Sequence, residues 1–186
     1  TSQRKILYSA FKRNLNKEIK VAQFGGYVSE HSNYHHGENS LMESIVGLAQ
    51  NFVGSNNINL FTPSGQFGTR INPKSASPRY IYTKLEKITK YIFIDDDLPL
   101  LNYINDDGDL VEPEFYIPII PLILINGTKG IGTGFSTEVL CYNPKDIINY
   151  LKQKLYNKKL TKNLKPFYNN FNGHIIYLNY GKYLIK

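Results

Sequence analysis

The 186-residue sequence predicts an α+β fold in which three helices precede a β-rich segment. Two observations predict this order. Apolar residues recur at helical spacing through the first third of the chain, and prolines and glycines then cut it into short stretches. A hydrophobic share of 41% and a charged share of 20% are ordinary for a folded protein and exclude wholesale disorder. A chain of this length can bury a sizeable core.

Amphipathic patterns define the three predicted helices. The second runs from Ile19 to Val28, the third runs from Leu41 to Phe52, and Gly54–Asn57 supplies the turn chemistry that ends the third. The first helix is indicated by Ile6, Leu7, Ala10, Phe11 and Leu15.

From Asn59 onward, short stretches separated by Pro and Gly predict a β-hairpin or wing, with residues 79–82 as a strand that leaves it. Three helices followed by a wing are the order of a winged helix-turn-helix domain. Such a domain places one helix in the major groove of DNA.

The rest of the chain predicts shorter elements. Helices are expected at residues 85–92 and 144–155, and strands at 173–178 and 183–185. The other segments are expected to be irregular: loops at Asp95–Asp97 and Asn105–Asp109, buried β-branched residues among prolines at 116–125, and a glycine-rich turn at 127–134.

Charge divides the sequence into three blocks. Residues 1–82 carry 9 basic and 4 acidic side chains, residues 83–140 carry 4 and 10, and residues 141–186 carry 9 and 1, with a total of +7. A basic face beside an acidic region suits a protein that lies on a polyanion with one side. Solvated surface explains each block equally well, so charge alone leaves both interpretations open.

Several protein classes are excluded. No apolar run approaches the roughly 18 residues of a spanning helix, and no apolar signal region follows the basic N-terminus, so we expect no membrane partner. The single cysteine, Cys141, cannot form an internal disulfide and fits a reducing compartment. Because no initiating Met is present, we expect the chain to be part of a longer protein.

Short motifs for nucleotides and metals do not hold. Within Gly127–Gly134 and beyond, Phe135 stands where a dinucleotide pattern needs its third Gly, and no Lys-Ser/Thr follows as a P-loop requires. Asn105–Asp109 lacks the alternating ligands of a calcium loop. No companion ligand pair at zinc spacing accompanies His31, His35 and His36. The sequence therefore predicts no metal and no cofactor within the chain.

Seven uncommon strings occur in order, and together they carry a family resemblance. They are Gln3-Arg-Lys5, Tyr34-His-His-Gly-Glu38, Ala49-Gln-Asn-Phe-Val-Gly-Ser55, Gly65-Gln-Phe-Gly-Thr-Arg70, Ser77-Pro-Arg-Tyr80, Glu112-Pro-Glu-Phe-Tyr-Ile-Pro118 and Leu124-Ile-Asn-Gly-x-x-Gly-Ile-Gly-Thr-Gly134. The set resembles the DNA breakage–reunion region of type IIA DNA topoisomerases, specifically eukaryotic topoisomerase II and its viral relatives. It implies a winged-helix domain at residues 1–142 and the beginning of a mixed α/β tower domain at residues 143–186.

The resemblance assigns chemistry to four residues. Tyr80 would attack a DNA phosphodiester and become joined to the 5′ phosphate. An ordinary phenol, with a pKa near 10, is only about one part in a thousand ionised at pH 7, so it needs nearby cations or a base. Arg79 would contact the scissile phosphate, because a guanidinium stays charged and donates two parallel hydrogen bonds. His36 and Arg4 would also reach this site.

The same resemblance implies DNA contacts. Ile131 resembles an isoleucine that wedges between base pairs and bends the duplex, and the glycines around it would let the backbone run close to DNA. The basic segment Lys152–Lys165 could supply surface for the arms of the bend. Contacts with the DNA backbone, which position the duplex without reading its sequence, are expected from His35, Lys5, Lys12, Arg13, Lys20 and Arg70.

Cofactors and partners also follow from the family. The complete, ATP-dependent enzyme would hold Mg²⁺ in an acidic Toprim module and ATP in a separate ATPase domain, both outside this chain. Its partners would be double-stranded DNA and a second copy of the protein. We therefore predict that the isolated fragment binds DNA weakly and does not cleave it. The enzyme would work in the nucleus, or in cytoplasmic viral factories if it comes from a large DNA virus.

Two other functions remain open. A non-catalytic winged-helix DNA-binding module predicts that replacing Tyr80 by Phe in the full-length protein changes nothing. A structural dimerisation domain predicts no salt-dependent DNA affinity, whereas several phosphate contacts give a steep dependence on salt.

Overall fold

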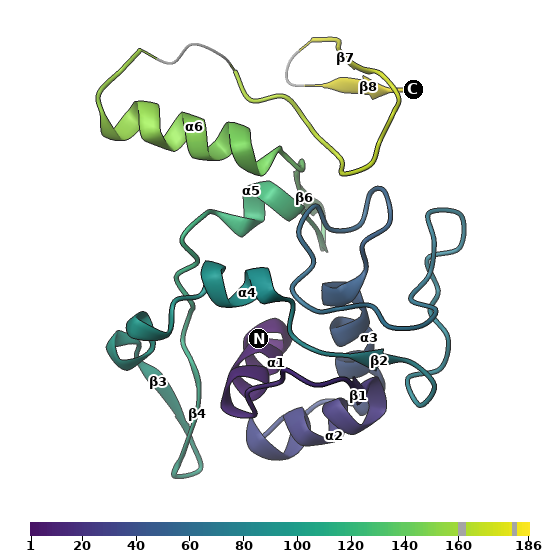
Figure 1. The fold of residues 1–186 in the computed structure, drawn as a ribbon, viewed down its shortest axis with the longest axis vertical. Coiled ribbons are helices and arrows are strands. Elements are labelled where there is room, and N and C mark those ends of the chain that lie inside the picture. The colour runs from purple at the N-terminus through teal and green to yellow at the C-terminus, as the bar shows by residue number, and fades with distance from the viewer. Residues whose placement is uncertain (160–162, 180–181) are drawn as a thin grey trace. The chain divides into compact units, whose positions relative to one another are not determined.

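The computed structural model describes residues 1–159, 163–179 and 182–186, which form two compact units. The first unit contains Thr1–Asn51 and Ile58–Ile119, and the second contains Phe52–Asn57 and Ile120–Lys186. Helices and short antiparallel strands alternate in both, in agreement with the predicted α+β fold class (Figure 1).

Three helices build the core of the first unit. α1 (Ser2–Lys12), α2 (Val21–His31) and α3 (Glu38–Ala49) pack against one another, as Figure 1 shows. Each buries the apolar stripe that the sequence predicts, and burial of one such large side chain contributes roughly 1.5–3 kcal/mol. The side chains with no exposed surface include Ile6, Ala10, Phe24, Val28, Leu41, Ile45 and Ala49.

Two helix boundaries differ from the prediction. α2 begins at Val21 rather than Ile19, because Ile19 and Lys20 form strand β1 (Ile19–Lys20) and pair antiparallel with β2 (Tyr82–Thr83). α3 ends at Ala49 rather than Phe52, because the next residue has an extended backbone with ψ of 135°.

The prediction of a β-hairpin at residues 59–82 is wrong in detail, because most of this wing is an irregular loop. Only isolated bridges occur in it, between Phe61 and Leu85 and between Ser64 and Tyr82. The strand predicted at 79–82 begins only at Tyr82. The wing therefore lacks a strand ladder of its own.

A glutamine side chain helps to hold the two arms of the wing together. The Gln50 amide nitrogen donates hydrogen bonds to the carbonyls of Phe67 and Pro73, at 2.8 and 2.9 Å. Gly68 has a φ of 94°, and a Cβ there would lie 2.5 Å from the Pro73 carbonyl oxygen, so the close approach of the two loop arms requires glycine.

The acidic half of the first unit is more regular than predicted. α4 (Lys87–Ile92) confirms the expected helix, but Asp95–Asp97, expected as a loop, begins the 3₁₀ helix η1 (Asp95–Leu100). β3 (Tyr103–Asp106) and β4 (Asp109–Pro113) form an antiparallel hairpin around the second expected loop. Its two turn residues, 107 and 108, both have positive φ, as a two-residue hairpin turn needs.

Residues 116–125 are predicted to be buried, and most are not. Ile117, Ile119 and Ile123 are each more than half exposed, whereas Ile125 is fully buried in α5 (Leu122–Asn126). Pro118 and the second proline of the stretch have no N–H group, so at these positions the segment cannot donate the hydrogen bonds of a central strand in a sheet.

In the second unit, a hairpin replaces the predicted glycine-rich turn. β5 (Thr128–Gly132) and β6 (Phe135–Val139) pair antiparallel in continuous register. The helix α6 (Pro144–Leu155) begins where predicted, with the side chain of residue 143 capping it at 2.9 Å. β7 (Ile175–Tyr177) and β8 (Tyr183–Ile185) form the last hairpin, close to the predicted strands.

Asn57 connects the parts of the second unit. Its amide nitrogen donates to the carbonyls of Ile125 and Phe167 at 2.8 and 3.0 Å, and its Oδ1 accepts from the backbone N–H of Asn169 at 2.8 Å. One short segment, residues 52–57, therefore belongs to a unit whose other residues begin at 120. The predicted division into a winged-helix domain at 1–142 and a tower domain at 143–186 concerns family domains rather than compact units, and it stays a prediction.

Candidate functional site

Tyr80 lies on an exposed turn whose surroundings are fixed. Its backbone N–H donates to the Ser77 carbonyl at 2.9 Å, and the following residue, Ile81, is only 1% exposed. The Ile81 carbonyl accepts from the Val21 N–H at 3.0 Å, which ties the turn to the start of α2. The Tyr80 side chain itself is 69% exposed. The fold thus fixes the backbone of Tyr80 and leaves its phenol open to a large substrate.

Arg79 shares this turn. Its guanidinium carbon lies 5.4 Å from the centre of the Tyr80 ring, and its Nε donates to the Ser77 hydroxyl at 3.4 Å. A cation over an aromatic face is attracted by the ring's quadrupole, which favours this arrangement. A permanent positive charge and an exposed phenol therefore lie side by side, as the sequence predicts.

The Tyr34-His-His string connects α2 to α3 and is anchored by its tyrosine. Tyr34 is 8% exposed, and its hydroxyl lies 3.3 Å from the Ser2 hydroxyl. The ring of His36 packs edge-on against Tyr34, with ring centroids 5.5 Å apart. The Nε2 atom of His35 lies 3.1 Å from the Asp106 carboxylate on the β3–β4 hairpin. Both histidine rings are exposed on this anchored segment.

The two basic residues at the start of α1 differ in their surroundings. Arg4 is half-buried, and its Nη1 donates to the Pro113 carbonyl at 3.5 Å. Lys5 is only 7% exposed, with its ammonium 2.8 Å from the Glu112 carboxylate and bonded also to the Ser32 carbonyl. Lys5 thus lies on the buried face of α1 with its charge already paired, and its predicted DNA contact stays a prediction.

These residues form two groups. Arg79 and Tyr80 contact each other, while Arg4 and His36 belong to a network around Lys5. In the part of the chain that the structure describes, no hydrogen bond, ion pair or ring contact joins the two groups. The convergence of all four predicted catalytic side chains on one phosphate stays a prediction.

The other predicted DNA contacts occupy accessible positions. Lys12 and Arg13 lie at the end of α1, with the Arg13 guanidinium carbon 4.8 Å from the Tyr27 ring centre. Arg70 is exposed in the wing, and Lys20 is half-buried in β1. Their contacts with DNA stay predictions. Part of the predicted basic segment Lys152–Lys165, residues 160–162, lies outside the described residues.

Ile131 is the fourth of the five residues of β5 and is 83% exposed. Its neighbour Gly130 has no atom within 4 Å of an added Cβ, and at Gly132 the nearest atom would be 3.8 Å away. Neither glycine has the positive φ that would explain it by backbone conformation. Neither packing inside the described chain nor backbone conformation therefore accounts for these two glycines.

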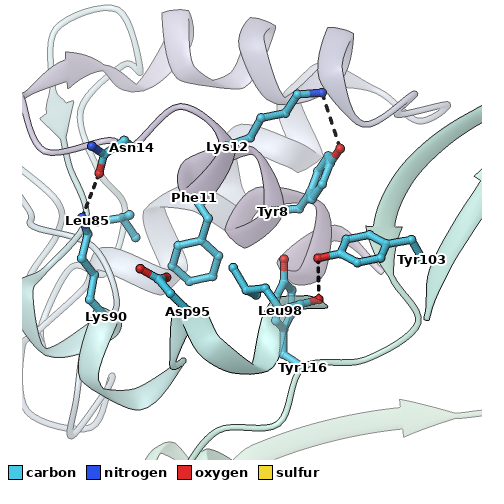
Figure 2. A pocket seen from close by; sticks show the side chains of 10 residues that line it. All are labelled: Tyr8, Phe11, Lys12, Asn14, Leu85, Lys90, Asp95, Leu98, Tyr103 and Tyr116. Carbon is cyan, nitrogen blue, oxygen red and sulfur yellow. Dashed lines mark hydrogen bonds between the residues drawn. The ribbon is translucent and has the colours of Figure 1, made fainter. Parts of the chain in front are cut away.

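A cavity of about 560 Å³ beside α1 is a feature that the sequence does not predict (Figure 2). Tyr103 donates to the Leu98 carbonyl at its edge, at 3.1 Å. Burial raises the pKa of the Tyr116 phenol far above its ordinary value, and nearby tyrosines add to this. Its lining is aromatic with a charged rim: Tyr8, Phe11, Tyr103, Tyr116, Lys12, Lys90 and Asp95.

Neither a metal site nor a membrane helix occurs in residues 1–159, 163–179 and 182–186. Within those ranges no three His, Cys, Asp or Glu side chains gather as a metal site would require. Over the same ranges, no helix has both the length and the apolar character needed to cross a membrane.

Sequence reasoning misses three residues that contact Lys5 or His35. Glu112 belongs to one of the seven strings but receives no role there, Asp106 falls in a segment expected to be a solvated loop, and Ser32 lies in no motif. Each acts through a partner far away in sequence, as for Lys5 and Glu112, which are 107 positions apart. Pattern and spacing carry no signal for such a pair.

Comparisons with known proteins identify relatives that match almost the whole chain. A family model that describes the A-type subunit of DNA gyrase/topoisomerase IV matches residues 1–185. The mitochondrial DNA topoisomerase 2 of Dictyostelium discoideum is 54% identical over 175 residues, which are 93% of this chain and 14% of that protein. DNA topoisomerase 2 of Drosophila melanogaster is 50% identical over 184 residues, which are 98% of this chain and 13% of that protein. The chain thus spans a small part of the length of these relatives.

A solved structure gives the same result. It is described as the DNA-binding, cleavage and re-ligation domain of Plasmodium falciparum topoisomerase II. Its TM-score is 0.93 at 48% sequence identity, and the match covers 98% of this chain and 25% of that one. The predicted fold class and the resemblance to eukaryotic topoisomerase II are confirmed.

Proposed function

This chain belongs to the type II DNA topoisomerase family, and we propose that it is the part of the enzyme that breaks and rejoins DNA. In this proposal, the Tyr80 oxygen attacks the phosphorus of a DNA phosphodiester and forms a 5′-phosphotyrosyl bond. The 3′ oxygen leaves and takes up a proton to become a hydroxyl, while the phenol loses its own proton. Attack by that 3′-hydroxyl on the phosphotyrosine reverses the step and restores the strand. One phosphoester replaces another, so no oxidant or reductant is needed.

The observation that carries this proposal is the exposed pair of Arg79 and Tyr80 on a fixed turn, with the guanidinium carbon 5.4 Å from the ring. Arg79 would stabilise the charge that develops on the phosphate oxygens during attack. His36 and Arg4 would contact the phosphate beside the break. A guanidinium suits this role because it stays charged and donates in a planar fork.

DNA binding is proposed to occur mainly through the phosphate backbone. His35, Lys12, Arg13, Lys20 and Arg70 would hold the duplex without reading its sequence. On the second unit, Ile131 would wedge between base pairs, which costs a few kcal/mol in lost stacking. The open space around Gly130 and Gly132 supports this proposal, because both would allow a duplex to approach the β5 backbone.

The complete protein would pass one duplex through the break in another and so change DNA topology. As the family resemblance implies, we place the metal and the ATP in other domains of a homodimeric enzyme. Mg²⁺, when bound there, supplies positive charge to the phosphate. The isolated chain would then bind DNA weakly without cleaving it. The complete enzyme would work in the nucleus, or in viral factories for a viral source.

The test is to trap a denaturant-stable protein–DNA link in the complete protein and to map the attached residue. Tyr80→Phe should abolish the link and leave DNA affinity largely unchanged. Tyr82→Phe is the matched control, because it removes a partly exposed phenol two residues away and should keep the link. A link that survives Tyr80→Phe would contradict the assignment of Tyr80 as the nucleophile. Metal-dependent DNA cleavage by the isolated chain would contradict the proposal that this chain does not cleave DNA alone.

A further inference from the structure

The ammonium group of Lys5 joins three segments of the first unit. It lies 2.8 Å from the Glu112 carboxylate on β4, and it donates to the Ser32 carbonyl at the end of α2. The Lys5 side chain is 9% exposed and that of Glu112 is 1% exposed. A lysine and a glutamate are thus paired almost entirely out of water.

Two of these segments lead to residues of the proposed cleavage site, and the first is α1. Arg4 precedes Lys5 on the same turn of α1, and its Nη1 contacts the carbonyl of Pro113, which follows Glu112. The pair therefore sets the position of α1 against the end of β4, and with it the position of the Arg4 side chain.

The segment after Ser32 leads directly to the histidines. The Ser32 hydroxyl donates back to the Val28 carbonyl at 2.6 Å, and its backbone N–H does so at 3.1 Å, which fixes the direction of its own carbonyl. Asn33 then has a positive φ of 47° and turns the chain into the buried Tyr34. The His36 ring packs against Tyr34, so this short anchored segment links it to the Lys5 ammonium.

Stability alone gives little reason to keep this pair. Desolvating two charges offsets much of their attraction, and a well-packed apolar pair of similar volume is often as stable. The geometry of the pair, by contrast, is specific, because the ammonium satisfies both a carboxylate and a backbone carbonyl.

We propose that the Lys5–Glu112 pair is a positioning element for DNA cleavage, which holds Arg4 and the His36 segment in register without touching DNA. This inference rests on the proposed function, since it concerns the same site. It predicts that loss of the pair slows strand cleavage while the affinity for DNA stays the same. A misplacement of about 1 Å in a catalytic group can lower a rate by about a hundredfold.

The experiment uses the complete protein with three variants. Lys5→Met breaks the pair, the double variant Lys5→Met/Glu112→Leu replaces it by an apolar pair, and Lys17→Met is the matched control at an exposed lysine to which we assign no role. Three quantities are measured: hydrogen-exchange protection of α1 and α2, the DNA dissociation constant at several salt concentrations, and the rate of covalent link formation.

For the double variant we expect exchange protection close to wild type, an unchanged dissociation constant and salt slope, and a cleavage rate lower by about tenfold to a hundredfold. Lys17→Met should match the wild type. If cleavage recovers together with protection in the double variant, the pair is only structural and the inference is wrong. If the dissociation constant rises and the salt slope falls by about one, Lys5 contacts a phosphate and the inference is also wrong.

A further variant, Glu112→Gln, keeps the inference testable if the double variant does not fold. Glu112→Gln keeps an oxygen that can accept from the ammonium, so the Ser32 bond and the cleavage rate should survive better than in Lys5→Met. Equal loss in both variants would contradict positioning by geometry. Tyr80→Phe separates this test from the proposed function. If this variant still forms the covalent DNA link, the proposed function is wrong. If it loses the link, a failed test of the Lys5–Glu112 variants contradicts only the inference about that pair.

Discussion

The backbone of Gly65 lies directly against the side chain of Ile81, the residue that follows Tyr80. A Cβ added at Gly65 would be 3.0 Å from Ile81 Cγ2, and the glycine has a φ of 109°. Both facts require glycine, since a side chain would be strained and would press on Ile81. The first glycine of the wing string thus supports the turn that presents the proposed nucleophile.

The first prediction concerns this contact. Gly65→Ala should lower the free energy of unfolding of the chain by about 1–3 kcal/mol, because the backbone conformation is unfavourable for a residue with a Cβ. It should also slow formation of the covalent DNA link in the complete protein. Gly26→Ala is the control, because it lies in α2 with nothing within 4 Å and should stabilise the chain slightly. Denaturant unfolding compares the two, and equal effects would contradict the argument.

The second prediction concerns the charge beside the phenol. Arg79→Ala in the complete protein should lower the rate of covalent link formation by about a hundredfold to a thousandfold, as loss of one charge-stabilising donor does elsewhere. DNA affinity should fall by much less. Arg79→Lys should restore only part of the rate, because an ammonium lacks the planar fork. Rapid-quench measurement of the link decides this, and full rescue by lysine would show that charge alone suffices.

The third prediction concerns the exposed hairpin. Ile131→Ala should reduce the bend of bound DNA, measured by energy transfer between dyes at the two ends of a duplex. The thermal midpoint of the chain should not change, because the side chain is 83% exposed. Ile117→Ala is the control at another exposed isoleucine, in the first unit, and it should leave the bend of bound DNA unchanged. An unchanged bend in Ile131→Ala would remove the wedge from the proposed function.

The fourth prediction concerns alkaline pH. Burial raises the pKa of Tyr116 in the folded chain, so the unfolded chain loses that proton first as pH rises past about 10. Stability is therefore fully present below this pH and falls above it, by at most about 1.4 kcal/mol per pH unit for this group. Tyr116→Phe should flatten the decline, whereas Tyr91→Phe at an exposed position should not. Urea unfolding between pH 8 and pH 11 measures both.

The sequence predicts the four longest helices well because each carries its own evidence. α1, α2 and α3 bury apolar stripes that any helical projection shows, and α6 begins at a Pro preceded by a capping Asn. The wing is different, because two of the bonds that hold its arms together come from the side chain of Gln50, which lies 17 and 23 residues before its two acceptors. Local preference for strand or loop cannot reveal such a partner.

The candidate site divides in the same way. Tyr80 and Arg79 follow from one string of adjacent residues, and the structure places them together. Lys5 and Lys12 look alike in the sequence of α1, yet one is buried against Glu112 and the other is exposed. Only the long-range pairing distinguishes a structural lysine from one that can reach DNA.

The bonds of Asn57 determine how the molecule can be divided. A polypeptide that started at residue 120 would contain all the helices and strands of the second unit and still lack the amide to which Ile125 and Phe167 bind. Aspartate in its place would fill the same volume but donate no N–H to those carbonyls. Because synthesis runs from the N-terminus, Asn57 is made before residues 120–186, so its amide is already present when the rest of the second unit is synthesised.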